Sequence, residues 1–86
     1  MYSVEVEKRC LRELKNIDKS VVRRAFELIE HVIAHDPYSG KELKGKYKGL
    51  FSYRFAEYRI VYEVKKKQLI VVVLRIRHRK HVYDGL

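Results

Sequence analysis

Large apolar side chains alternate with polar ones over residues 50–55 and again over residues 58–64. Alternation with period two is typical of strands, so these runs predict the arms of one β-hairpin with a turn at residues 56–57. In this register Arg54 lies directly opposite Arg59 on the more polar face. Like charges so placed destabilise a sheet, so either both guanidinium groups reach into water or they form a site for an anion. The other face pairs Phe55 with Tyr58, Tyr53 with Ile60 and Phe51 with Tyr62.

The first half of the chain predicts a short strand and then two helices. Residues 2–6 alternate like a strand with one buried face, and apolar residues recur at helical spacing over residues 8–17 and again over residues 19–35. Asp18 can cap the second helix, and Asp36-Pro37 ends it because the residue before a proline avoids helical geometry. Helices so close in sequence form a hairpin whose apolar side chains belong to the core.

The last strand is predicted at residues 69–77, which are apolar on both faces and therefore central in the sheet. A turn centred on Lys66 and Lys67 pairs Val64 with Leu69, Tyr62 with Val71 and Ile60 with Val73. The opposite face then mixes apolar and cationic residues, namely Ser52, Arg54, Arg59, Val61, Ile70, Val72, Leu74, Ile76 and, at its end, His78. Two helices cover only one face of such a sheet, so the apolar strip on the other face predicts a partner.

Length and composition predict one small domain over residues 1–86, with 47% hydrophobic residues to build a single core. Cys10 is the only cysteine and cannot form an intrachain disulfide, so we expect a cytoplasmic protein in which this thiol is a small buried apolar group. No apolar signal segment follows Met1, and the longest apolar run is far shorter than the roughly 20 residues of a membrane span.

The excess of positive over negative charge is confined to the second half of the chain. Residues 1–40 contain seven Lys or Arg and seven Asp or Glu, whereas residues 41–86 contain thirteen and four. A one-sided basic surface attracts polyanions, above all nucleic acid, although an acidic protein partner or a merely soluble basic surface fits the same distribution.

Two local patterns could bind ligands. Lysines interleaved with a tyrosine and glycines over residues 41–49 suit a phosphate backbone and a stacked base, or else form a solvated loop. His31 and His35 have a spacing that can chelate a metal, but no third ligand is evident, and a solvated helix face is the favoured interpretation.

The chemistry-bearing residues exclude most enzyme classes. The sequence contains no Ser-His-Asp order, P-loop, dinucleotide fingerprint or zinc spacing, and residues 41–86 hold too few acids for a metal-dependent nuclease. One reaction suits arginine, lysine, histidine and tyrosine alone: the 2′-hydroxyl of RNA attacks its own neighbouring phosphate and expels the 5′-oxygen. Arg54 and Arg59 could clamp that phosphate, and a residue of the segment 78–83 could act as general acid.

The order of elements and three motifs resemble the RelE/ParE superfamily of type II toxins over residues 2–83. The motifs are Leu43-Lys44-Gly45, then Tyr53-Arg54-Phe55 with Tyr58-Arg59-Ile60-Val61-Tyr62, then Arg77-His78-Arg79 with Val82-Tyr83. The resemblance implies an α+β fold. In it an N-terminal strand and a two-helix hairpin precede a three-stranded antiparallel meander, and both helices lie on one face of one sheet.

The resemblance to RelE-like members implies an mRNA interferase that cuts mRNA in the ribosomal A site without a metal or other cofactor. It implies that Arg54 and Arg59 stabilise the phosphate and activate the 2′-hydroxyl, that Arg79 assists the leaving oxygen, and that Tyr83 stacks on or orients the nucleotide. The family's lysine on this strand falls near Ser52 here, where Lys46 or Lys48 could replace it. His78 is a candidate for proton transfer. Further RNA contacts are expected at Lys44, Lys46, Lys48, Arg77 and Lys80.

Two other functions stay open within the resemblance. ParE-like members share the fold but poison DNA gyrase and cut no RNA, and a degenerate toxin would only bind its antitoxin. The basic residues favour the nuclease. In each case the resemblance implies a cognate acidic antitoxin of the RelB type, an amphipathic chain that wraps this domain.

Overall fold

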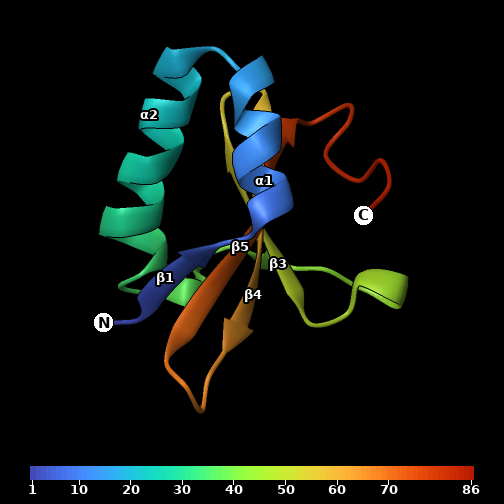
Figure 1. Cartoon of the computed structure of the whole chain (residues 1–86). Helices are drawn as coiled ribbons and strands as arrows, with labels where there is room; N and C mark the ends of the chain where they lie inside the picture. The colour runs from blue at the N-terminus through green and yellow to red at the C-terminus, as the bar shows by residue number, and fades with distance from the viewer.

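The computed structural model describes residues 1–86 and contains one five-stranded sheet with both helices on one face (Figure 1). The strands lie side by side in the order β1-β5-β4-β3-β2. Their bounds are β1 Ser3–Val6, β2 Lys41–Glu42, β3 Leu50–Phe55, β4 Tyr58–Lys65 and β5 Ile70–His78. The predicted antiparallel meander is confirmed as β3, β4 and β5. The N-terminal strand joins it parallel to β5, so the sheet is mixed.

The two predicted helices are present. Helix α1 (Lys8–Glu13) continues as a 3₁₀ turn over Leu14–Asn16, and α2 (Lys19–Leu28) continues as a π-helical turn over Ile29–Ile33. The Asp18 carboxylate accepts hydrogen bonds from the hydroxyl of Ser20 at 2.7 Å and from its backbone N–H at 2.8 Å. The backbone bond caps α2 as expected, and the two bonds, chiefly the one from the hydroxyl, lower the pKa of Asp18. No helix combines the length and the apolar character needed to cross a membrane.

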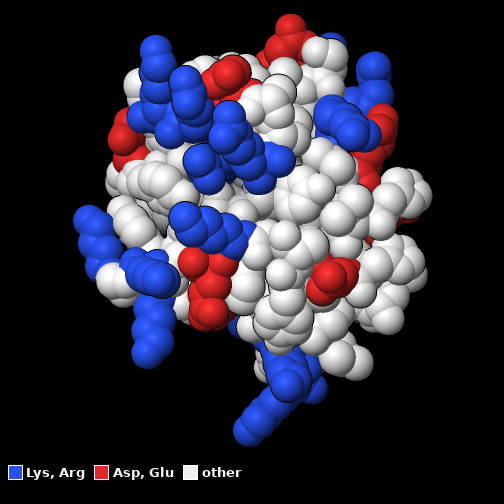
Figure 2. Space-filling model, turned by 180° about the vertical axis from the view of Figure 1, so that it is seen from behind, with Lys and Arg blue, Asp and Glu red and all other residues white.

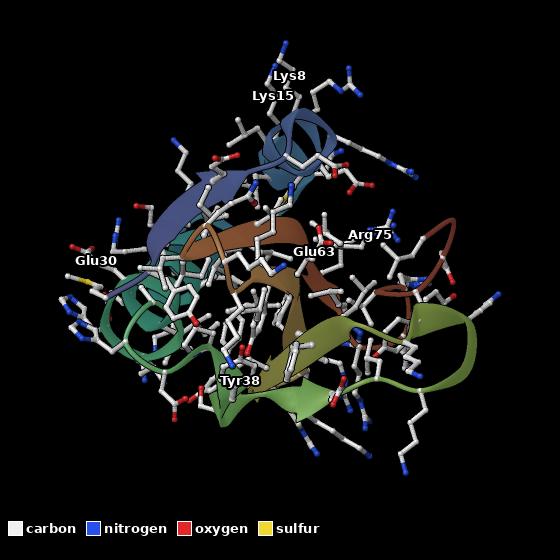
Figure 3. All side chains as sticks on the ribbon, turned by 90° about the horizontal axis from the view of Figure 1, so that it is seen from below. Lys8, Lys15, Glu30, Tyr38, Glu63 and Arg75 are labelled. Carbon is white, nitrogen blue, oxygen red and sulfur yellow. The ribbon has the colours of Figure 1, made fainter.

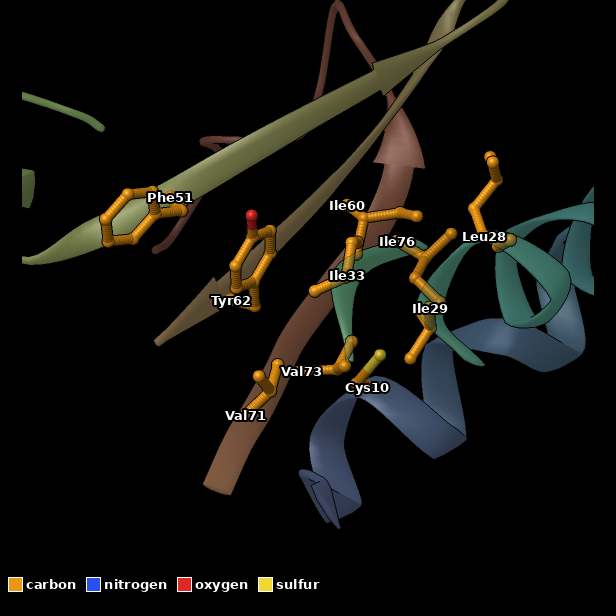
Figure 4. Close-up of a cluster of buried hydrophobic side chains, with 11 residues drawn as sticks. Cys10, Leu28, Ile29, Ile33, Phe51, Ile60, Tyr62, Val71, Val73 and Ile76 are labelled. Carbon is orange, nitrogen blue, oxygen red and sulfur yellow. The ribbon is translucent and has the colours of Figure 1, made fainter. Parts of the chain in front are cut away.

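The core lies between the helices and one face of the sheet (Figure 4). Cys10 of α1 is 1% exposed there, and burial raises the pKa of its thiol to about 11. A thiol held in its neutral form is a poor nucleophile, so Cys10 behaves as the apolar core residue that was expected. The core cluster consists of Cys10, Ala25, Leu28, Ile29, Ile33, Phe51, Ile60, Tyr62, Val71, Val73 and Ile76.

The β3–β4 hairpin has the predicted register at every position, including Arg54 opposite Arg59. The β4–β5 register differs from the prediction. Val64 pairs with Val71 and Tyr62 with Val73, because the connecting turn is longer than expected and Leu69 lies within it with a φ of 56°. The strand is thereby shifted by two residues, which preserves the faces of its first half.

A β-bulge then reverses the faces in the second half of β5. Val61 pairs with Arg75, so Leu74 has no partner on β4, and Ile60 pairs with Ile76. Ile76 is therefore a core residue with 1% exposure, and His78 pairs with Tyr58 on the helix-covered side. The prediction that Ile76 and His78 lie on the opposite face is wrong, because that prediction assumed unbroken alternation.

The opposite face is also less open than predicted, because the C-terminal residues 79–86 fold back over part of it. The Arg75 side chain is buried and donates from Nη1 to the carbonyl oxygens of Val82, at 3.1 Å, and of Asp84. Val61 and Val82 are fully buried. Figure 3 labels Arg75 on β5 beside this returning segment. The apolar centre of the face is thus covered by the protein's own tail.

Candidate functional site

Three arginines form a row across the sheet on the face away from α2. Arg54 of β3 pairs with Arg59 of β4, and Arg59 pairs in turn with Arg77 of β5. Neighbouring strands are about 4.8 Å apart, so the three side chains emerge close together with like charge. We call Arg54, Arg59 and Arg77 the arginine row. Lys and Arg side chains gather around this end of the sheet when the molecule is seen from behind (Figure 2).

The arginine row is neutralised at one end only. Arg77 Nη1 lies 3.7 Å from Glu13 Oε2 and is a third exposed, whereas Arg54 and Arg59 form no salt bridge. Arg54 is exposed and Arg59 is half-buried. Two unpaired guanidinium groups side by side repel each other, and an anion between them would relieve that repulsion.

A hollow of about 380 Å³ adjoins Arg54 and Arg59 where β2 meets β3. We call it the β2–β3 hollow, and its lining residues are Ser39, Gly40, Lys41, Ser52, Tyr53, Arg54 and Arg59. Lys41 pairs directly with Ser52, so both side chains lie on the face of the arginine row. Sequence reasoning placed Lys41 only in the basic loop over residues 41–49 and did not predict that it pairs with Ser52, because β2 has only two residues and shows no periodic pattern.

Arg79 lies at the tip of the β3–β4 hairpin. Its backbone N–H donates to the carbonyl of Glu57 at 2.8 Å, and its Nε lies 2.6 Å from Glu57 Oε2. Both side chains are half-exposed. The structure thus brings Arg79 to the end of the hairpin that carries Arg54 and Arg59, with its guanidinium group held by an acid.

Tyr83 lies against the basic loop rather than against the arginine row. Its ring stacks on Tyr47 with centroids 5.4 Å apart, and Lys46 Nζ lies 5.2 Å from the centre of the Tyr47 ring on that loop. The Tyr47 hydroxyl also donates a long hydrogen bond of 3.5 Å to the carbonyl of Tyr83. A tyrosine pair with a lysine beside it is a surface on which a base can stack.

His78 is separated from Arg54 and Arg59, although it lines one hollow together with Arg77. It packs edge-on against Tyr58 on the helix-covered side, with ring centroids 5.6 Å apart, and lines a polar hollow of about 250 Å³ with Glu13, Asp18 and His81. Proton transfer between His78 and a phosphate held by Arg54 and Arg59 is therefore not favoured by this geometry.

The predicted RNA-contacting lysines are distributed around the site. Lys44 and Lys48 line a separate hollow of about 220 Å³ on the basic loop, and Lys80 is exposed just after β5. Neither Lys46 nor Lys48 lies across from Ser52, the position that Lys41 occupies. No three His, Cys, Asp or Glu side chains converge as a metal-binding group would require.

Comparison with known proteins gives concordant matches. The family model described as "ParE toxin of type II toxin-antitoxin system, parDE" matches residues 4–83. The chain is similar to Toxin RelG of Mycobacterium tuberculosis, with 28% identity over 83 residues and coverage of 95% of each chain. It is also similar to the Putative toxin RelE1 of Methanocaldococcus jannaschii, with 29% identity over 88 residues and coverage of 98% of this chain and 97% of the relative.

A solved structure matches the fold along nearly the whole chain. It is the toxin–antitoxin complex RelBE2 from Mycobacterium tuberculosis, with a TM-score of 0.85 and 28% identity. The match covers 91% of this chain and 98% of that chain. The arrangement of helices and sheet described above is therefore the RelE-like fold.

Proposed function

Because this chain belongs to the ParE toxin family of type II toxin–antitoxin systems, within the RelE/ParE superfamily, we propose that it is a metal-independent endoribonuclease that cleaves mRNA in the ribosomal A site. The 2′-hydroxyl of the substrate attacks the adjacent phosphorus and loses its proton. The bond to the 5′-oxygen breaks, and that oxygen takes up a proton. The products are a 2′,3′-cyclic phosphate and a 5′-hydroxyl.

The observation that supports this proposal most directly is the pair Arg54 and Arg59, in register and without an acidic partner. The nucleophile belongs to the substrate, so the protein need only position the phosphate and stabilise the charge that develops on its oxygens. Two guanidinium forks on adjacent strands match two non-bridging oxygens.

Arg79 is proposed to stabilise the leaving 5′-oxygen. To do so it exchanges Glu57 for the substrate, and this exchange is inexpensive because a half-exposed ion pair contributes only about 0–1 kcal/mol. Tyr83, stacked on Tyr47, is proposed to hold a nucleotide base next to the scissile phosphate. The RNA backbone is proposed to contact further basic residues around the site, namely Lys44, Lys46, Lys48, Arg77 and Lys80.

An acidic antitoxin of the RelB type is the proposed partner. The similar solved structure from Mycobacterium tuberculosis is a toxin–antitoxin complex. This chain has a net charge of +9, concentrated after residue 40, so a negatively charged chain would be attracted to the surface that the RNA is proposed to use. The proposed action on ribosomes implies that the protein works in the cytoplasm.

Translation in a cell extract tests the proposal. We expect purified protein to cut ribosome-bound mRNA, detected by primer extension, and Arg59→Ala to lower the cleavage rate about 10²- to 10³-fold, as loss of one preorganised charge does. Lys66→Ala removes the same charge from the exposed β4–β5 turn and should cleave like the wild type. Unchanged cleavage by Arg59→Ala would refute its catalytic role.

The family model supports a second candidate, a gyrase poison without nuclease activity, because the model describes ParE toxins. The same protein preparation added to a DNA supercoiling assay distinguishes the two. Inhibited supercoiling together with intact mRNA would select the ParE-like function. Binding of an antitoxin with neither activity would identify a degenerate toxin.

A further inference from the structure

The β2–β3 hollow contains an unsatisfied polar group. Ser52 is 3% exposed, and its Oγ has no hydrogen-bond partner. Buried hydroxyl groups are almost always paired, because removal from water without a partner is costly. Ser52 lines the hollow together with Lys41, Arg54 and Arg59, so a ligand in the hollow would lie next to the residue that carries the unpaired hydroxyl.

The charge of the hollow defines the class of ligand. Three of its lining residues, Lys41, Arg54 and Arg59, are cationic and none is acidic. A cradle with three positive charges and a hydroxyl donor fits an anion with several oxygens.

Packing around Gly40 fixes the position of Lys41. A Cβ atom at Gly40 would lie 2.5 Å from the Tyr62 hydroxyl and 3.0 Å from the carbonyl oxygen of Ser52. The Tyr62 hydroxyl is itself held by a 2.7 Å hydrogen bond to the carbonyl of Pro37. The absence of a side chain at Gly40 lets β2 lie close against β3, which brings Lys41 opposite Ser52.

We propose that the β2–β3 hollow is a second phosphate subsite, in which Lys41 and Ser52 hold the RNA phosphodiester next to the scissile one. The Lys41 ammonium pairs with one non-bridging oxygen, and the Ser52 hydroxyl donates to another. This inference rests on the proposed function, since it takes the bound strand to be RNA. It makes Lys41 a binding residue of the site and explains the otherwise unpaired Ser52 hydroxyl.

The test measures binding without cleavage. The probe is a fluorescent single-stranded RNA whose 2′-hydroxyls are methylated, and its affinity for the full chain is measured over a series of salt concentrations. We expect Lys41→Ala to weaken binding about tenfold and Ser52→Ala about threefold. Loss of one phosphate contact by Lys41→Ala should also lower the slope of log affinity against log salt by about 0.7.

Matched variants and competition complete the design. Lys66→Ala should keep the wild-type slope, and Lys41→Arg should retain most of the affinity because it keeps the charge. Equal melting temperatures for Ser52→Ala and the wild type would show that its weaker binding is not a folding defect. Equal affinity and slope for Lys41→Ala and Lys66→Ala would overturn the subsite. Inorganic phosphate is added as a competitor at the concentration of phosphate groups that the RNA supplies. Displacement of the RNA at that concentration would also overturn the proposed subsite, since the hollow would then take a free anion.

The subsite and the nuclease can fail separately. Cleavage in extracts with no effect of Lys41→Ala or Ser52→Ala on RNA binding would remove the subsite and leave the nuclease. The expected changes in binding without cleavage would keep the subsite and remove the nuclease.

Discussion

Arg75 and Arg59 lie on neighbouring strands and on the same face of the sheet, yet their surroundings are opposite. Arg75 is 1% exposed, donates to two carbonyl oxygens of the C-terminal segment, and its Nε lies 3.5 Å from Glu13 Oε1. Arg59 is half-buried, forms no salt bridge and borders a hollow. One guanidinium group is bonded within the chain, and the other forms no salt bridge. Position on a face therefore does not decide the role of an arginine, and its partners do.

The largest stability effect is expected when Arg75 is removed. Arg75→Ala leaves two tail carbonyls without their donor and leaves Glu13 with Arg77 as its only cationic partner, so we expect the free energy of unfolding to fall by about 3–5 kcal/mol. Urea unfolding followed by circular dichroism measures this loss. Arg59→Ala is the matched variant on the same face and should change the free energy of unfolding by less than about 0.5 kcal/mol. Equal losses of stability in the two variants would show that Arg75 and Arg59 do not differ in their structural role.

A smaller effect is expected from Gly40→Ala, which disturbs the open region without removing a charge. The new methyl group would collide with the Tyr62 hydroxyl and press on the Ser52 carbonyl, so we expect a loss of about 1–3 kcal/mol and weaker RNA binding as β2 moves away from β3. The double variant Gly40→Ala/Tyr62→Phe lacks the hydroxyl that the new methyl group would meet. It should therefore recover part of the lost stability and part of the lost RNA affinity. Additive losses in urea unfolding would show that this contact does not position β2.

A smaller loss of stability at neutral pH than that of Gly40→Ala is expected from Tyr62→Phe. Loss of the hydrogen bond to Pro37 should cost about 1 kcal/mol at pH 7. Burial raises the pKa of Tyr62 from 10.0 to about 12, so its neutral form is favoured by folding. That contribution is complete below pH 10 and is lost as the pH rises towards 12, because the unfolded chain then releases a proton that the folded chain retains.

The alkaline limb of the stability curve therefore identifies the Tyr62 contribution. Between pH 10 and 12 the wild type should lose about 2–3 kcal/mol more than Tyr62→Phe, since one pKa unit corresponds to about 1.4 kcal/mol. Thermal melting of both proteins at several pH values measures the difference. If the melting temperatures of the two proteins fall in parallel as the pH rises from 10 to 12, the Tyr62 hydroxyl does not titrate with a raised pKa in the folded protein.

Prediction from the sequence succeeded where residues close together in the chain determine the local backbone structure. A strict alternation and a two-residue turn determined the β3–β4 register, and with it the pairing of Arg54 and Arg59. Asp18 and Asp36-Pro37 delimited the second helix for reasons that act within a few residues. These features require no knowledge of distant parts of the chain.

The features that sequence reasoning missed depend on contacts between distant segments. β5 is apolar on both faces, so nothing in its composition marks the bulge at Leu74 or the change of face after it. Arg75 looked like one more basic residue, and only the returning tail makes it structural. Lys41 seemed to belong to a loop, because a two-residue strand leaves no periodic signal and is recognised only beside its neighbour Ser52.

The unpaired Leu74 makes β5 one residue longer than the stretch of β4 it faces. A lineage could lose that leucine by deletion and keep every other pairing between these two strands. A deletion nearer the end of the strand, at Ile76 for example, would bring Arg77 opposite Ile60 and turn a guanidinium group into the core. Variation in the length of this strand should therefore be confined to one position in its middle, although both of its ends adjoin loops.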